Sequence, residues 1–151
     1  MNEKLIEWND TDIEIGYKGS LDVLLHERFT ENAECVAAKD QSGVFTYAQL
    51  EAASNAVSDI VRAAAEQNVC VLVGNRAERL AYVTGIIKAG RTYVPLGMNT
   101  PVKRNMEIVS NVEPGFILTD EENREDAELI ASECGIPAEK VLIRTMSELE
   151  K

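Results

Sequence analysis

The chain has 151 residues, a length that suits one domain and allows a buried core without disulfides or metal ions. Hydrophobic residues make up 45% of it, which excludes disorder as a description of the whole chain. It carries 15 Lys and Arg against 26 Asp and Glu, a formal net charge of −11. This acidic balance disfavours nucleic acid and anionic membrane surfaces as partners, because both require clustered Lys and Arg.

The sequence indicates a cytoplasmic protein. No apolar stretch reaches the roughly 20 residues needed to cross a bilayer, and the start at Met1 lacks the pattern of a signal peptide. The three cysteines, Cys35, Cys70 and Cys134, lie far apart, and the chain has a single histidine, which excludes a zinc site of the CxxC type. We expect the cysteines to be small buried hydrophobic residues in a reducing compartment.

The first 20 residues are predicted to be an irregular, linker-like leader, and residues 21–151 one partial α/β domain. Leu21, Leu25 and Phe29 recur at intervals of four, which predicts one apolar face of a helix. Two short strands, 35–39 and 44–45, should follow, joined by a polar turn.

The clearest helix start lies at Thr46. Thr46 and Gln49 have the spacing of a capping box, and Phe45 and Leu50 occupy the positions of a hydrophobic staple. An apolar stripe continues along this helix through Leu50, Ala53, Val57, Ile60 and Ala64.

Strands and helices then alternate. The continuous apolar run 69–73 predicts a strand buried on both faces, as in a parallel sheet. Further strands are predicted at 92–96, 116–118 and 141–143. The intervening helices are predicted at 77–89 with Gly90 after it, from Thr100-Pro101 with Val102, Met106 and Val109 inside, and from Asp120 to Gly135. This alternation predicts a three-layer α/β fold with a mainly parallel sheet and helices on both faces.

Near the end of the chain, Thr145 and Glu148 repeat the spacing of a capping box about one turn before Lys151. This pattern favours a polypeptide that stops within its architecture, and a short terminal helix is the alternative.

The residues alone predict no catalytic, cofactor-binding or metal-ligating site. Neither phosphate-loop pattern, GxxxxGK[ST] or GxGxxG, is present, and the single glycine at Gly74 predicts a strand-to-helix turn. His26 has no Ser or Cys placed beside it and should be a surface or half-buried helix residue. The acidic run 120–126 lacks calcium-loop spacing and suits the first turn of a helix.

Two longer motifs and three shorter ones carry a family resemblance. Residues 45–50, FTYAQL, resemble the first core motif of nonribosomal peptide synthetase adenylation domains, L-T-Y-x-E-L. Residues 87–96, IKAGRTYVPL, resemble the second, L-K-A-G-x-A-Y-V-P-L. The shorter matches are Trp8–Thr11 with the helix Leu25–Phe29, Arg76 with Glu78, and Pro101 with Arg104. Together they cover about residues 8–120, in the order and spacing of this adenylate-forming family.

The resemblance implies the N-terminal portion of the large subdomain of an amino-acid adenylating ligase. Such an enzyme forms aminoacyl-AMP from ATP and an amino acid, with magnesium, and loads a phosphopantetheine carrier. The phosphate loop, the amino-acid pocket and the catalytic lysine of the family all follow the part present here. The chain alone is therefore expected to be inactive and to hold no cofactor. It also departs from the family at Gly97-Met98, where Asp-Pro is common, and in a shortened stretch 65–69.

The resemblance also implies partners. The first is the remainder of an adenylation domain or synthetase, and the second is an MbtH-like activator bound near the P-x-x-R helix. Val102 and Arg104 are the candidate contacts for that activator, although Val102 is larger than the usual Ala and also suits a core-facing position. Two alternatives stay open: a non-enzymatic interaction module that pairs with a complementary chain or itself, and an unrelated small-molecule-binding domain with its site beyond the strand ends.

Overall fold

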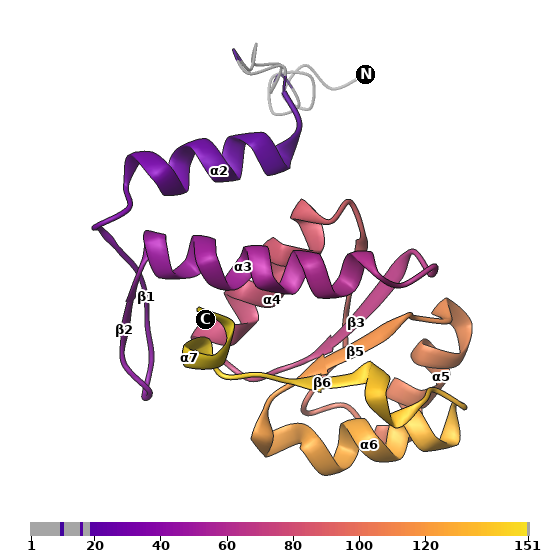
Figure 1. Ribbon diagram of the computed structural model, residues 1–151. Helices are drawn as coiled ribbons and strands as arrows, with labels where there is room; N and C mark the ends of the chain where they lie inside the picture. Colours follow the sequence, from indigo (N-terminus) through magenta and orange to yellow (C-terminus); the bar gives the residue numbers. More distant parts are fainter. Residues whose placement is uncertain (1–9, 11–15, 17–18, 151) are drawn as a thin grey trace.

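Four parallel strands form the main sheet, in an order that differs from the order of the chain (Figure 1). The computed structural model describes residues 10, 16 and 19–150. The strands, in their order across the sheet, are β4 (Thr92–Pro95), β3 (Asn68–Leu72), β5 (Phe116–Thr119) and β6 (Val141–Ile143). All neighbouring pairs are parallel. The chain therefore leaves β3 toward one edge of the sheet and then crosses to the other side of β3.

Helices lie on both sides of this sheet (Figure 1). On one side are α2 (Leu21–Glu31), α3 (Tyr47–Arg62), α4 (Ala77–Lys88) and α7 (Met146–Leu149), of which α2 and α7 pack on α3 and α4. On the other side are α5 (Val102–Val112) and α6 (Arg124–Glu133). The 3-10 helices η1 (Glu121–Asn123) and η2 (Ala138–Lys140) precede α6 and β6. The expected three-layer α/β fold is confirmed.

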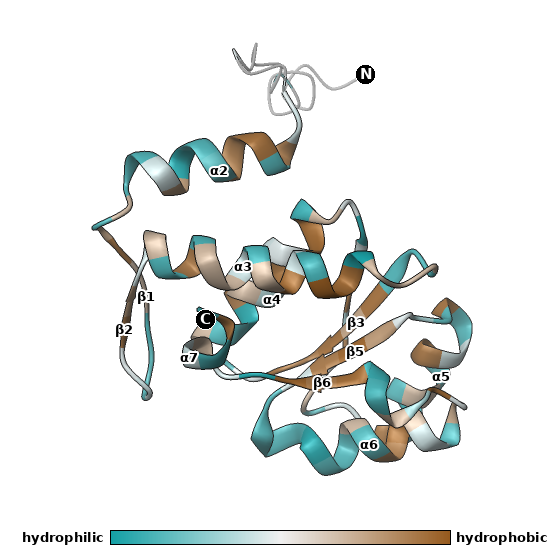
Figure 2. Ribbon diagram, viewed as in Figure 1, coloured by the Kyte–Doolittle hydropathy of each residue, from teal (hydrophilic) through white to brown (hydrophobic). Residues whose placement is uncertain are grey.

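Strand β3 divides the core into two apolar clusters. Val69 and Val71 contribute to the cluster under α3 and α4, whereas Cys70 and Leu72 contribute to the cluster under α5 and α6. All four side chains are buried, as the apolar run predicted, and the strands of the sheet carry the most hydrophobic colours in Figure 2. Parallel strands covered on both faces need apolar side chains at every position, which is why no alternation with polar residues is visible in the sequence.

A separate antiparallel hairpin is formed by β1 (Val36–Lys39) and β2 (Val44–Thr46). It lies beyond the start of α3, away from the main sheet (Figure 1). The Asp40 side chain closes the turn, because its Oδ1 accepts hydrogen bonds from the Ser42 N–H at 2.7 Å and the Ser42 hydroxyl at 2.5 Å. The two predicted strands are thus confirmed, as a hairpin outside the parallel sheet.

The predicted helix boundaries are largely confirmed. Gln49 N–H donates to Thr46 Oγ1 at 3.3 Å and Thr46 N–H donates to Gln49 Oε1 at 2.9 Å, which completes the capping box of α3. Gly90 and Gly135 follow α4 and α6 with positive φ of 68° and 71°, the left-handed conformation that glycine adopts without strain. The short terminal helix at the end of the chain is α7, and it also begins with a capping box.

Some sequence expectations were wrong in detail. Thr100 does not cap α5, because its N–H donates to the Gly97 carbonyl in a turn and Pro101 is the residue before the helix. Asp120 caps η1 rather than α6 itself. Ile60, expected in the stripe of α3, is only half-buried, since Val61 faces the core instead.

Two other residues expected to be buried are exposed. Cys35 is exposed because it leads into the hairpin, which is covered from one side only, whereas Cys70 is buried. Leu21 is 52% exposed, so only the later turns of α2 reach the core at Phe29. The predicted leader, including Trp8, falls outside the described residues apart from a few positions. Across the described part of the chain, no helix combines the length and apolar character needed to cross a bilayer.

Candidate functional site

The carboxyl ends of β3 and β5 mark the position where an open parallel sheet normally binds its ligand. The chain moves from β3 to β4 on one side and to β5 on the other, and such a reversal leaves a crevice between the two strand ends. Gly74 follows β3 and Asp120 follows β5 at this crevice. These residues and their neighbours therefore form the first candidate site.

The Asp120 carboxylate fills this crevice. Asp120 is only 6% exposed, and its Oδ2 accepts the Gly74 N–H at 2.8 Å. Its Oδ1 accepts the Asn123 N–H at 3.0 Å and the Asn123 side-chain amide at 2.6 Å. Arg76 lies above it, with Nε 3.9 Å from Asp120 Oδ2 and a second nitrogen 2.7 Å from Glu122. A carboxylate of the chain itself thus occupies the backbone amide that would otherwise face a bound anion.

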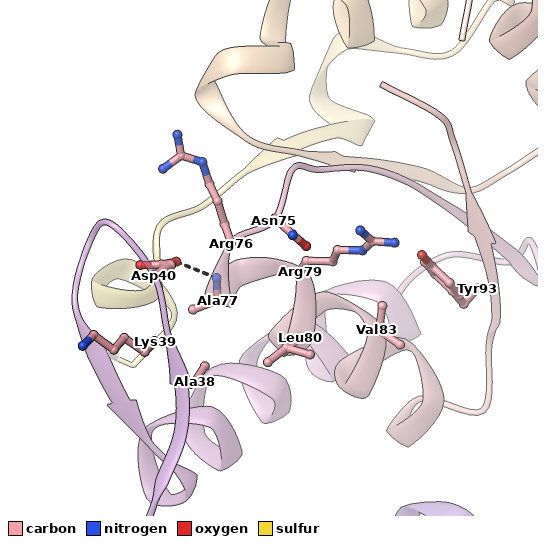
Figure 3. Close-up of a pocket in the computed structure, with 10 residues that line it drawn as sticks. All are labelled: Ala38, Lys39, Asp40, Asn75, Arg76, Ala77, Arg79, Leu80, Val83 and Tyr93. Atoms are coloured by element: carbon pink, nitrogen blue, oxygen red, sulfur yellow. Dashed lines mark hydrogen bonds between the residues drawn. The ribbon is translucent and has the colours of Figure 1, made fainter. Parts of the chain in front are cut away.

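A pocket of about 670 Å³ lies beside this crevice and is the largest concave feature described (Figure 3). Three elements surround it: the end of β1 with its turn, the first turns of α4, and β4. Its lining consists of Ala38, Lys39, Asp40, Asn75, Arg76, Ala77, Arg79, Leu80, Val83 and Tyr93. The volume lies within the range of small-molecule sites.

Asp40 joins the hairpin to the start of α4 and so forms one wall of the pocket. Its Oδ2 accepts the Ala77 N–H at 2.7 Å, drawn as a dashed line in Figure 3. Arg76, the residue before α4, provides no side-chain cap, so Asp40 caps this helix from another part of the chain. Partial burial alone would raise the pKa of Asp40, but hydrogen bonds from Ser42, Ala77 and Gly43 outweigh it and lower the pKa.

The residues singled out from the sequence do not come together at one site. His26 lies on α2, where its Nδ1 is 2.7 Å from Glu51 Oε1 and its side chain is 66% exposed, as expected for a surface histidine. Val102 is half-buried against the core under α5 and α6. Arg104 is exposed and pairs with Glu107 at 2.8 Å. Within the described residues, no group of three or more His, Cys, Asp or Glu could hold a metal ion.

The sequence analysis missed the residues that build the pocket. Asp40 was assigned only to a polar turn, and neither Arg79 nor Tyr93 was singled out for binding. The i, i+2 spacing of Asp40 and Ser42 is a usable signal for the turn itself. Nothing in the sequence indicates that the same carboxylate also reaches the N–H of Ala77, 37 residues further along the chain.

Comparison with known proteins assigns the chain to a family. The profile of the AMP-binding enzyme family matches residues 25–150. The chain belongs to this AMP-binding enzyme family. The resemblance drawn from the two core motifs is thereby confirmed, and the alternative of an unrelated small-molecule-binding domain is wrong.

The curated relatives of this AMP-binding chain include peptide synthetases. It is 32% identical over 124 residues to a linear gramicidin synthase of Brevibacillus parabrevis, a match that covers 78% of this chain and 2% of the synthase. It is 27% identical over 131 residues to a plipastatin synthase of Bacillus subtilis, covering 85% of this chain and 5% of that protein. The chain therefore spans only a small part of the relatives it matches.

Solved adenylate-forming enzymes share the fold of the AMP-binding chain. A benzoate CoA ligase from Burkholderia xenovorans superimposes with a TM-score of 0.76 at 12% identity, over 88% of this chain and 28% of that one. The anthranilate CoA ligase AuaEII, solved with anthranoyl-AMP, gives a TM-score of 0.76 at 14% identity, over 91% of this chain and 28% of its own. At these identities the likeness shows the fold alone.

Proposed function

We propose that the chain is the N-terminal scaffold of an ATP-dependent amino-acid adenylating ligase. The complete enzyme would form aminoacyl-AMP and pyrophosphate from ATP and an amino acid, and would transfer the aminoacyl group to a phosphopantetheine thiol. The observation that carries this proposal is the family match over residues 25–150, together with relatives that are peptide synthetases. The principal partner is then the rest of the adenylation domain or synthetase, which would supply the sites for ATP and magnesium.

The same proposal assigns no catalysis to this chain alone. Adenylation requires preorganised groups aimed at the charge that develops on the reacting phosphoryl and acyl groups. At the crevice between β3 and β5, the Gly74 amide is already bound by Asp120, and the Arg76 side chain pairs with Glu122. These internal contacts occupy the groups that would otherwise meet a phosphate there, which supports a scaffolding role.

Amino-acid-dependent exchange of pyrophosphate into ATP tests the inactivity directly. The purified chain is assayed with each of the twenty amino acids, and the adenylation domain of the linear gramicidin synthase that matches this chain serves as the positive control. We expect exchange with the control and none with the chain. Exchange by the chain with any amino acid would contradict the proposed inactivity.

The intact mass of the native protein, isolated from its source cells with an antibody to this segment, tests the link to a ligase. We expect a mass far above that of 151 residues, because the family enzymes are much longer. A mass equal to that of the chain would mean that any catalytic residues lie on a separate polypeptide. The non-enzymatic interaction module is not favoured, since the curated relatives are synthetases.

An MbtH-like activator at the start of α5 is a finer part of the proposal. Arg104 is exposed there and available to a partner, whereas the half-buried Val102 contributes to the core. Copurification with an MbtH-like protein, compared between the wild type and Arg104→Glu, tests this contact, and we expect the variant to retain less of the activator. We also propose self-association through surfaces that the rest of a ligase would cover, and a cytoplasmic location, supported by three free cysteines.

A further inference from the structure

The pocket in Figure 3 has no role in the proposed scaffold function, yet its polar and apolar groups are arranged as in a ligand site. We propose that it binds a small organic carboxylate, with the carboxylate held by Arg79 and Tyr93 and an apolar group resting on Leu80 and Val83. This site is separate from the crevice filled by Asp120, and the inference does not depend on the chain being part of a ligase.

Arg79 is the first reason for this assignment. Its side chain is exposed, and among the described residues no carboxylate lies within 4.0 Å of its guanidinium, whereas Arg76, Arg104 and Arg124 each pair with a glutamate. In a chain with a net charge of −11, an arginine without an acidic partner leaves an uncompensated positive charge. Guanidinium groups bind carboxylates with two parallel hydrogen bonds, which makes an anion of this shape the natural ligand.

The neighbouring polar groups converge with Arg79. In Figure 3 the guanidinium of Arg79 and the hydroxyl of Tyr93 point toward one another, and the amide of Asn75 lies beside them. Each of these side chains can donate a hydrogen bond to a carboxylate oxygen placed between them. Lys39 and Arg76 point away from this position in the same view. The donors are therefore Arg79, Tyr93 and Asn75.

The floor of the pocket is apolar. Leu80 is 44% exposed and lines the pocket together with Val83, Ala38 and the ring of Tyr93. An exposed leucine next to a concave wall loses contact with water when a ligand covers it, which favours binding of an apolar group. The combination of this floor with a convergent set of donors fits an acid with an aromatic or branched aliphatic group.

The single acidic residue in the lining does not oppose an anion strongly. The Asp40 oxygens already accept hydrogen bonds from Ala77, Ser42 and Gly43, and the side chain faces the start of α4. Its charge is thereby offset by backbone amides at the positive end of the helix.

The edge strand favours a small acid over a peptide added to the sheet. The Thr92 and Leu96 N–H groups donate to the Gln67 and Val71 carbonyls at 2.9 Å, so the alternate residues Tyr93 and Pro95 face outward. Proline has no N–H, and the outward side of β4 therefore offers at most one donor to an added strand. A compact ligand in the pocket does not need that edge.

The experiment is a titration followed by NMR of backbone amides and methyl groups, with phenylacetate as the ligand. Phenylacetamide has the same size without the charge, and acetate has the charge without the ring. We expect saturable shifts at Ala38, Asn75, Leu80 and Tyr93 with phenylacetate, and binding weaker by about tenfold or more with either comparison ligand.

Two variants complete the test. Arg79→Gln removes the positive charge from an exposed position and should fold normally, and we expect it to weaken phenylacetate binding by about tenfold. The matched control is Arg104→Gln, another exposed arginine on a helix, which should leave binding unchanged. Shifts that do not saturate, equal binding of phenylacetamide, or unchanged binding by Arg79→Gln would each overturn the assignment.

Discussion

The two faces of the sheet are stabilised in different ways. On the first face, α3 and α4 cross at Gly85, where an added Cβ would lie 2.6 Å from the Ser54 carbonyl oxygen, and a buried lysine links the same two helices. On the second face, α5 and α6 pack through aliphatic side chains such as Val109 and Ile130. Backbone contact and buried charge tolerate little displacement, whereas aliphatic packing adapts to small changes of shape.

Lys88 shows how the first face is fixed. Its Nζ donates to Glu51 Oε2 at 2.5 Å, to Ser54 Oγ at 2.8 Å and to Asn55 Oδ1 at 2.9 Å, so the buried ammonium has three acceptors. Burial alone would raise the pKa of Glu51, but hydrogen bonds from Lys88 and His26 outweigh it and lower the pKa. A charge that is paired in one arrangement only will specify the crossing of α3 and α4 as well as stabilise it.

The largest effect is expected from Gly85→Ala. The new methyl group would lie 2.6 Å from the Ser54 oxygen and from Val57 Cβ, so α3 and α4 must separate. We expect the free energy of unfolding to fall by about 3 kcal/mol or more, measured by urea denaturation. The control is Gly135→Asn at the end of α6, where an added side chain meets open space and should cost less than about 1 kcal/mol. Equal losses for the two variants would remove the contrast between the faces.

Lys88→Met should have the next largest effect, because it leaves the Glu51 carboxylate partly buried without its main partner. We expect a loss of about 2–4 kcal/mol at neutral pH. The pKa of Glu51 is lowered in the folded state, so this stabilisation is present above the unfolded pKa and is lost as the pH falls. The difference between wild type and Lys88→Met should therefore shrink as the pH falls below 4.5, the ordinary value for glutamate.

A double variant sharpens this result. Glu51→Gln should cost less in the Lys88→Met background than in the wild type, because the two side chains stabilise the fold as a pair. Additive losses would mean that the pair contributes nothing specific to the first face.

On the second face, Ile130→Val removes one buried methyl group and should cost about 1 kcal/mol. No ionisable group is involved, so this loss should be the same at neutral and acidic pH. Leu129→Ala is the matched control, since Leu129 is the neighbouring residue of α6 and is 48% exposed; it should change stability by less than about 0.5 kcal/mol. A pH-dependent loss for Ile130→Val would show that the second face also depends on charge.

The smallest of these effects on stability is expected from Asp40→Asn, which weakens the cap on α4. We expect a loss of about 0.5–1 kcal/mol at neutral pH, measured by thermal unfolding. The pKa of Asp40 is lowered in the fold, so its contribution is present above 3.8, the ordinary value for aspartate, and is lost below it. The variant and the wild type should converge at low pH, and a constant difference would mean that the charge of Asp40 is not involved.

Local signals in the chain were enough to predict the elements and the family of this protein. Capping boxes at Thr46 and Thr145, the glycines after α4 and α6, and the apolar run of β3 are all signals of this kind. Each arises from hydrogen bonds or packing between residues a few positions apart, which is why the composition of a short segment is enough to predict it. The two core motifs likewise lie within single segments.

The order of the strands, and with it both candidate sites, came from tertiary packing. The Asp120–Gly74 contact joins residues 46 apart, and the Asp40–Ala77 contact joins residues 37 apart. Such pairs depend on which strands become neighbours and on where the hairpin lies, and these follow from burying two helical layers against one sheet. The same global packing left Cys35 exposed and Cys70 buried, where burial raises the pKa of the Cys70 thiol to about 12.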